Sequence, residues 1–592
     1  MPLRNKGWAA GLVLALLGGG IAVAQSAPES LLPPGFGNTP AAPAPVQPAG
    51  PAPTPLLPPA STPDPLAAFD TGEDNSVVAE EDPAELAEKE LPSFARRDVS
   101  TVGFLTPDQG GYAEGAFGTT DGRYLATLLH RLNAPLPSRW GSILLRRALT
   151  SRVGAPAGVP AADWVAERAW TLLRMGEADA ARMLVQGVDG DRYSPWLVSV
   201  AKQTALATGD PSALCPIAQA GLSAAPKDKS WRLVQAICAA LSGEGGTATA
   251  MIERVRQGSG RDIDLLLAEK VAGAGIGGRR SISIDWAGVD RLTAWRFGLA
   301  NATGVAIPAD LYPTAGGQVR AWAARAPMMT VRQRIPFART AAALGVFSNA
   351  ALVDLYANDA AETDAMDIEG STAQTLRQAY VAADAGDRLT AIKAIWAKAS
   401  SPQDRYAAAI LTARAAARIA PSEDHDDDAA ALIAAMFSAG LDIPAARWAS
   451  VVTASGDDAA WALLAVGAER PVVDSSTGRV EDYVDNAGDE GRHRAALLVA
   501  ALAGLGRLPV AEVQRFDTIG PIVARNRWTD AIDLAAARGQ PGTVAILAAT
   551  GLQGRSWASI PAGHLYHIVA ALRRTGQEGA ARMIAAEAVA RS

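Results

Sequence analysis

The chain has only two cysteines, Cys215 and Cys238, and their positions suggest a covalent crosslink. Cys215 lies 11 residues before Pro226, which marks an expected turn between two helices, and Cys238 lies 12 residues after it. Residues at equal distances from the turn of an antiparallel helix hairpin face each other, so a disulfide bond is geometrically plausible. Such a bond forms in an oxidising compartment, for example a bacterial periplasm. The alternative is a pair of buried thiols that act as small apolar side chains.

Two other groups of residues are of types that could bind a metal ion. His564 and His567 are three residues apart on an expected helix, which can place two ligands on one face, but no acid or third histidine is close in sequence. Residues 423–428 (EDHDDD) lack the alternating ligands and the central glycine of a calcium-binding loop. We therefore expect structural histidines, and a solvated loop whose acids stabilise the start of the next helix. The sequence predicts no metal ion and no cofactor.

Residues 273–278 (GAGIGG) match the G-x-G-x-x-G pattern of dinucleotide-binding proteins. That site needs a strand before the glycines and a helix after them, so that the helix N-terminus meets the pyrophosphate. Here residues 262–270 have the composition of a helix, and we expect a loop between helices instead. The chain also lacks a G-x-S-x-G elbow, a cysteine–histidine nucleophile and a Walker loop. We assign no catalytic residue and do not expect an enzyme.

A repeated glycine–alanine spacing predicts the helices that would position any site. A glycine can end a helix in the left-handed conformation, and a small residue five positions later lets the next helix pack closely against the first. Hydrophobic residues make up 49% of the chain and charged residues 19%, with alanine, leucine and arginine in helix-forming runs. We therefore predict an all-α fold. The seven pairs are Gly176/Ala181, Gly243/Ala248, Gly345/Ala350, Gly386/Ala391, Gly440/Ala445, Gly506/Ala511 and Gly576/Ala581.

The pattern also divides the chain into segments. Residues 101–119 are glycine-rich and irregular, which suggests an N-terminal cap or hook. The first expected helices are residues 123–132, 139–152 and 162–174. The expected organisation is an N-terminal cap with the first helices at 93–160, helical repeats at 161–278 and 371–592, and an irregular helical middle at 279–370.

These repeats resemble the tetratricopeptide repeat, a 34-residue helix–turn–helix unit. Its second half typically carries Gly-Asp, an alanine five residues after the glycine, a hydrophobic helix and a proline. Residues 386–392 (GDRLTAI) with Pro402 follow that pattern, and residues 576–581 (GQEGAA) are similar. Spacings of 41 and 54 residues between the pairs from Gly345 to Gly440 depart from it. The resemblance implies a right-handed solenoid of helix hairpins, each touching only its neighbours, with a concave surface that binds peptides or proteins.

The N-terminus has the parts of an export signal. Arg4 and Lys6 give a positive start, residues 7–23 carry no charge, and small residues precede a cleavage site between Ala24 and Gln25. We expect residues 1–24 to be removed and the mature protein to be periplasmic. The alternative is an uncleaved anchor, because the uncharged stretch approaches the roughly 18 residues of a short membrane span. Contact with a membrane is expected only in that case.

Residues 25–92 are expected to be a disordered leader. Residues 28–65 are too rich in proline for helix or sheet and should sample extended polyproline II. Residues 66–92 hold nine acids and one lysine, which leaves a net charge of +1 on the rest of a chain whose total is −7. That body has no basic field that would hold nucleic acid. The acidic segment is a solvated linker or, alternatively, a docking arm for a basic partner.

These features together predict a non-enzymatic scaffold or adaptor of the bacterial cell envelope, which binds protein partners through a helical surface. The alternative is a peptidoglycan-active or glycan-binding envelope protein, with its chemistry in residues 279–330. A lytic transglycosylase would carry a lysozyme-like module with a catalytic glutamate at its C-terminus. Residues 564–592 have the pattern of one more helix pair instead.

Overall fold

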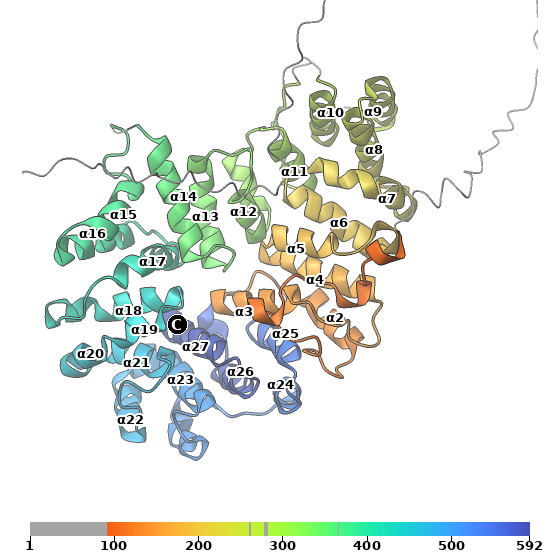
Figure 1. The fold of residues 1–592 in the computed structure, drawn as a ribbon. Coiled ribbons are helices and arrows are strands. Elements are labelled where there is room, and N and C mark those ends of the chain that lie inside the picture. The colour runs from red at the N-terminus through yellow and green to blue at the C-terminus, as the bar shows by residue number, and fades with distance from the viewer. Residues whose placement is uncertain (1–91, 260–261, 278–281, 365) are drawn as a thin grey trace, which may run out of the picture. The chain divides into compact units, whose positions relative to one another are not determined.

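The computed structural model describes residues 92–259, 262–277, 282–364 and 366–592 (Figure 1). They belong to one compact unit, Lys89–Ser592. Within these ranges the regular structure is helical, with no β-strand and one isolated parallel bridge between Leu105 and Ser151. The predicted all-α fold is confirmed for this part of the chain. The expected signal peptide with its Ala24–Gln25 cleavage site, and the leader up to residue 91, lie outside the described residues.

The helices follow one another closely along the chain. The α-helices are α2 (Gly122–Arg131), α3 (Arg139–Thr150), α4 (Ala161–Met175), α5 (Ala178–Val185), α6 (Pro195–Ala207), α7 (Ala218–Ala224), α8 (Lys229–Leu241), α9 (Gly245–Ser259), α10 (Ile263–Gly275), α11 (Ala294–Ala302), α12 (Gly317–Ala323), α13 (Val331–Ala343), α14 (Asn349–Glu362), α15 (Thr372–Val381), α16 (Ala385–Ala397), α17 (Pro402–Ala416), α18 (Ala429–Ser438), α19 (Asp442–Ala446), α20 (Ala449–Ser455), α21 (Asp458–Gly467), α22 (Thr477–Asn486), α23 (Gly488–Leu505), α24 (Arg527–Ala537), α25 (Pro541–Gly551), α26 (Ala562–Arg574) and α27 (Glu578–Arg591). The short 3₁₀-helices are η1 (Ser93–Ala95), η2 (Val99–Thr101), η3 (Pro107–Gln109), η4 (Gly190–Arg192), η5 (Pro211–Ile217), η6 (Ala309–Thr314), η7 (Glu423–Asp428), η8 (Val510–Ile519) and η9 (Trp557–Ser559).

The first helices begin and end within two residues of the positions predicted from the sequence. Helices α2, α3 and α4 correspond to the segments expected at 123–132, 139–152 and 162–174. Capping side chains fix two of these starts, since Asp121 accepts from the Tyr124 amide and Ser138 from the Gly141 amide. Gly176 ends α4 with φ 93° and so provides the left-handed C-cap that the sequence suggested.

Six of the seven glycines in the predicted pairs have positive φ, and Gly386 is the exception. Gly386 lies in the first turn of α16, where its amide donates to the Asp384 side chain at 2.7 Å. The expectation that Gly386 ends a helix is therefore wrong, because the N-cap of Asp384 starts a helix there instead.

The paired alanines are buried at five positions: Ala181, Ala248, Ala391, Ala445 and Ala581. The other two differ. Ala350 is half-buried, and Ala511 is exposed because a 3₁₀-helix, η8, follows Gly506 in place of an α-helix. The spacing thus predicts close packing where an α-helix follows the glycine at once.

Consecutive helices pack against each other in pairs, such as α4 with α5, α8 with α9, α15 with α16 and α26 with α27. Short connections between helices in contact make such neighbours antiparallel. Most buried apolar side chains form one continuous core, and a second, smaller core lies among α12, α13, α14, α15 and α17.

The first and last described α-helices share the main core. Helix α3 packs against α25 and α27, and α2 packs against α25 (Figure 1). The irregular segment expected as a cap also contacts α25, because the Gly542 amide donates to the Ala116 carbonyl at 2.9 Å and Thr543 Oγ1 donates to the Phe117 carbonyl at 3.1 Å. These contacts differ from a stack in which each repeat touches only its neighbours.

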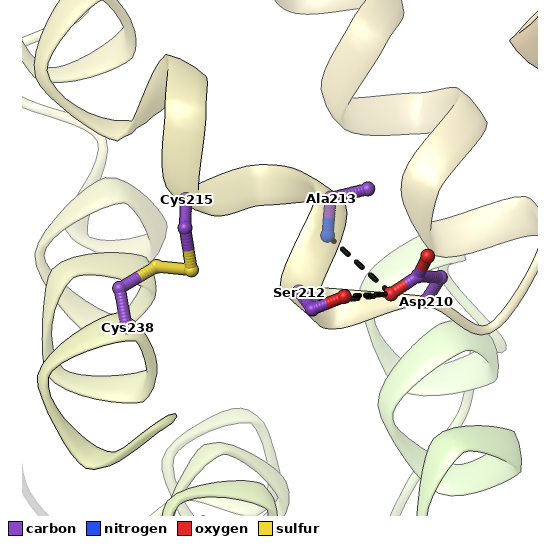
Figure 2. The surroundings of a disulfide bond; sticks show 5 residues. All are labelled: Asp210, Ser212, Ala213, Cys215 and Cys238. Carbon is purple, nitrogen blue, oxygen red and sulfur yellow. Dashed lines mark hydrogen bonds between the residues drawn. A yellow bond between two sulfur atoms is a disulfide. The ribbon is translucent and has the colours of Figure 1, made fainter. Parts of the chain in front are cut away.

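The predicted disulfide bond between Cys215 and Cys238 is present, with an S–S distance of 2.11 Å and a Cα–Cα distance of 5.5 Å (Figure 2). It joins η5 to α8, and Pro226 lies in the turn between α7 and α8 as expected. The start of η5 is fixed by Asp210, whose Oδ1 accepts from the amides of Ser212 at 3.1 Å and Ala213 at 3.4 Å. The bond therefore crosslinks η5 to α8 across the intervening helix α7 and the turn at Pro226.

Replacement of either cysteine by serine should destabilise the region between η5 and α8. The bond closes a loop of about 24 residues, for which the chain-entropy model gives roughly 3 kcal/mol. Amide hydrogen exchange in α8 should therefore become roughly a hundredfold faster, while exchange in α26 serves as the internal control. Cys215→Ser, Cys238→Ser and the double variant should have equal effects, because each removes the same bond. Effects that add in the double variant would contradict a crosslink.

Candidate functional site

A cleft of about 290 Å³ lies where three segments that are far apart in sequence meet. Helix α3 forms one side, the turn between α18 and α19 forms a second, and the turn into α27 with its first residues forms the third. The lining residues are Trp140, Ile143, Leu144, Arg147, Gly440, Asp442, Gly576, Gln577, Gly579, Ala580, Arg582 and Met583. The cleft therefore exists only when the N-terminal and C-terminal helices are packed together.

The side of the cleft formed by α3 follows from helical periodicity. Trp140, Ile143, Leu144 and Arg147 are spaced at i, i+3, i+4 and i+7, which places them on one face. Gly440 opposes this face with φ 74°, and a Cβ atom there would lie 3.0 Å from the Trp140 ring. Glycine is thus favoured at position 440 both by the left-handed turn and by the close approach of the tryptophan.

Most polar groups of the cleft are already paired. Arg582 is buried, and its Nη1 donates to Asp442 Oδ2 at 2.8 Å and to the Gly467 carbonyl at 2.7 Å. Gln577 is also buried, and its Oε1 accepts from the Tyr112 hydroxyl. These contacts hold the two side chains in place, so they contribute shape to the cleft rather than free hydrogen-bonding groups.

Arg147 is the exception. Its side chain is exposed, and its guanidinium makes no hydrogen bond or ion pair with any described residue. Burial raises the pKa of the nearby Tyr112, so that phenol stays neutral at physiological pH and does not offset the arginine charge. The cleft therefore presents one uncompensated positive charge beside apolar side chains.

The geometry of the cleft depends on a buried carboxylate, Glu587 of α27, at the N-terminus of α3. Its oxygens accept from Ser138 Oγ at 2.7 Å, from the Arg139 amide at 2.9 Å and from the Trp140 amide at 3.1 Å. Arg591, one turn later on α27, also donates to this carboxylate. A negative group is favoured here, because the first amides of a helix have no partner within it.

Arg139, the first residue of α3, connects α3 to two more helices. Its buried guanidinium donates to the Ser438 carbonyl at 3.2 Å, to the Phe347 carbonyl at 3.0 Å and to the Ala342 carbonyl. Ser438 ends α18, and Ala342 lies in the last turn of α13. Burial lowers the pKa of Arg139, and the neighbouring Tyr406 and Glu587 oppose this shift. The arginine thus donates to carbonyls at the ends of α13 and α18 and in the segment that follows α13.

Other arginines cap helix C-termini in the same way. Arg168 is fully buried and donates to the carbonyls of Leu149 and Ser151 at the end of α3, each at 2.8 Å. Arg174 donates to the Leu129 carbonyl at 2.6 Å at the end of α2, and Arg507 to the Ala465 carbonyl at 2.6 Å in α21. A cation at the C-terminal end of a helix also interacts favourably with its dipole.

The two histidines that resembled a metal pair have different partners. Both lie on α26, as expected, but His567 Nδ1 is 3.0 Å from Asp533 Oδ2, whereas His564 packs its ring on Trp528 at 4.4 Å. Within the part of the chain that the structure describes, no group of three or more His, Cys, Asp or Glu side chains is placed to hold a metal ion.

Two other segments singled out by the sequence are more helical than expected. Residues 423–428 form η7, and the Asp428 side chain pairs with Lys393 at 2.9 Å. Gly273 and Gly275 lie in the last turn of α10, which begins at Ile263, so these glycines end a helix instead of forming a loop. No strand precedes them in the described residues, and Gly278 lies outside those residues.

The sequence did not identify the cleft. The glycines of two glycine–alanine pairs, Gly440 and Gly576, line it, but nothing local indicated that their turns meet α3. Trp140, Ile143 and Arg147 have the spacing of one helix face, but no sequence feature singled them out. What it would contact depends on the packing of distant helices.

Comparison of the chain with protein-family models, with curated proteins and with solved structures gives no match. In the described residues, no helix is both long enough and apolar enough to cross a membrane.

Removal of the Glu587 carboxylate should strongly destabilise the protein. Glu587→Ala leaves the Arg139 and Trp140 amides and the Arg591 guanidinium without their buried acceptor, which costs about 3–5 kcal/mol in comparable sites. Urea unfolding followed by circular dichroism measures this loss. The control is Glu512→Ala, which removes a solvent-accessible pair of the half-buried Glu512 with the exposed Arg515 at 2.7 Å and should change the midpoint little. Equal effects of the two substitutions would contradict the role of Glu587.

Proposed function

We propose that the protein is an exported, non-enzymatic scaffold or adaptor of the bacterial cell envelope and that it binds a protein partner in the cleft between α3, α19 and α27. The observation that carries this proposal is the composition of the cleft. It combines an aromatic ring, aliphatic side chains and one unpaired cation, Arg147, on rigid elements. Concave sites with apolar walls and a few fixed polar groups are typical binding sites.

The helix arrangement is part of the same proposal. We interpret the paired helices as tetratricopeptide-like hairpins in a right-handed solenoid, supported by the left-handed glycines that end helices such as α4 and α23. In this interpretation, α27 is not a free end of the stack but lies against α3. The binding surface is then the cleft at this junction.

The proposed compartment is the periplasm. A disulfide bond between Cys215 and Cys238 is compatible with an oxidising environment. The signal-like residues 1–24 and the near-neutral body, which has no basic field for nucleic acid, favour the same assignment.

The alternative function, an enzyme that acts on glycans, is less favoured. The reason is the composition of a second cleft, which lies in residues 279–330. That cleft, of about 210 Å³, extends to α13 and has a mainly apolar wall that includes Tyr312, Met328, Met329 and Phe337. Among the described residues that line it, none carries a carboxyl group. Most glycoside hydrolases need a pair of carboxyl groups. We therefore give this region no catalytic role in the proposal.

Site-specific photo-crosslinking in intact cells tests the proposed function. A photoreactive phenylalanine analogue at Ile143, in the half-buried wall of the cleft, should give a discrete crosslinked adduct with one envelope protein. The same analogue at Leu534, an exposed residue of α24 outside the cleft, is the matched control and should not give that adduct.

Adducts identified by mass spectrometry separate the possible outcomes. A protein that crosslinks from Ile143 and not from Leu534 supports a binding role for the cleft. Absence of any adduct from Ile143, or identical adducts from both positions, would contradict it.

A further inference from the structure

We infer that the cleft binds a segment of the partner protein in which an aspartate or glutamate lies beside a large apolar side chain. This inference rests on the function proposed above and specifies the chemistry of the partner. It is drawn from the one charge in the cleft that the protein itself does not neutralise.

The apolar part of the ligand is indicated by the walls. Trp140 and Ile143 are only half-buried, and Leu144 and Met583 complete an apolar surface beside them. Aromatic residues that become fully desolvated in a bound interface commonly carry much of its binding energy. The volume of about 290 Å³ is at the lower limit of the roughly 300–1,000 Å³ of typical ligand pockets. It therefore suits a short peptide segment that inserts one large side chain.

The acidic part of the ligand is indicated by charge. Of the three charged residues in the lining, Arg582 and Asp442 neutralise each other at 2.8 Å, which leaves Arg147 uncompensated. A guanidinium presents a planar fork of donors that matches a carboxylate in a bidentate pair. A basic segment would place its charge against Arg147 and would be repelled.

Hydrogen bonds hold the walls of the cleft in place without a ligand. Glu587 fixes the start of α3 relative to α27, and Arg582 is tied both to Asp442 and to the end of α21 through the Gly467 carbonyl. Arg582 therefore cannot turn into the cleft to take over the ligand carboxylate. Preorganised walls reduce the entropy lost on binding, so Arg147 remains the group that selects the charge of the ligand.

Selection from a displayed library of random 12-residue peptides tests this inference with the full mature chain. We expect enrichment of peptides with an acid within two residues of Leu, Ile, Phe, Met or Trp. Synthetic copies should bind at least tenfold more weakly to Arg147→Glu, and only a few-fold more weakly to Arg147→Lys, which keeps the charge but loses the planar fork. Arg555→Glu is the matched control and should bind normally, because Arg555 is exposed, lies outside the cleft, and has a guanidinium that makes no hydrogen bond or ion pair with any described residue.

Urea midpoints of all three variants establish that each is folded, and the outcomes are then distinct. Enriched peptides that lack acids, or that bind Arg147→Glu as tightly as the wild type, overturn the inference and leave protein binding in place. A selection that enriches nothing also overturns it, and crosslinking from Ile143 then decides the proposed function separately. If inorganic phosphate binds as tightly as the peptides at the same concentration, the cleft is a simple anion site, and this result would also contradict the inference.

Discussion

The packing of α27 on α3 depends on one buried carboxylate. Glu587 accepts from the first amides of α3 and from Ser138, more than 440 residues earlier in the chain. The next side chain of α3, Arg139, extends the connection to the ends of α13 and α18. Together with the Arg591 bond to the Pro137 carbonyl at 2.9 Å, this contact fixes how α27 lies on the start of α3, beside the cleft.

Arginines at helix ends explain how alanine-rich helices reach defined positions. Small apolar side chains pack closely but specify orientation weakly, whereas a guanidinium must meet particular carbonyls. Arg168, Arg174 and Arg507 each donate to carbonyls near the end of another helix, where the regular hydrogen bonding of the helix ceases. Burial lowers the pKa of Arg168 and Arg507. A cation near the C-terminal end of a helix is favoured by the helix dipole, which opposes the cost of burying a guanidinium there. The helix ends thereby act as the fixed points of the packing.

Local features could be predicted from the sequence because their causes are local. Asp121 and Ser138 mark the starts of α2 and α3, Gly176 ends α4, and the distances from Pro226 place the two cysteines opposite each other. The prediction that Gly386 ends a helix is wrong because its amide donates to the Asp384 side chain, which starts a helix there.

The candidate site could not be predicted in the same way. Glu587 and Arg147 look like ordinary residues of amphipathic helices, and only the packing of α27 on α3 gives one of them a buried partner and leaves the other without any. The spacing of residues within one helix does not indicate that α27 and α3 will pack together.

A double-mutant cycle between Ser138→Ala and Glu587→Gln tests this account most directly, because it measures the coupling between the two ends rather than the cost of either change. Groups in direct hydrogen-bonded contact typically couple by about 0.5–3 kcal/mol in the free energy of unfolding. Ser138 Oγ and Glu587 are 2.7 Å apart, so we predict coupling in that range. Independent, additive effects of the two substitutions would mean that α27 does not hold the start of α3.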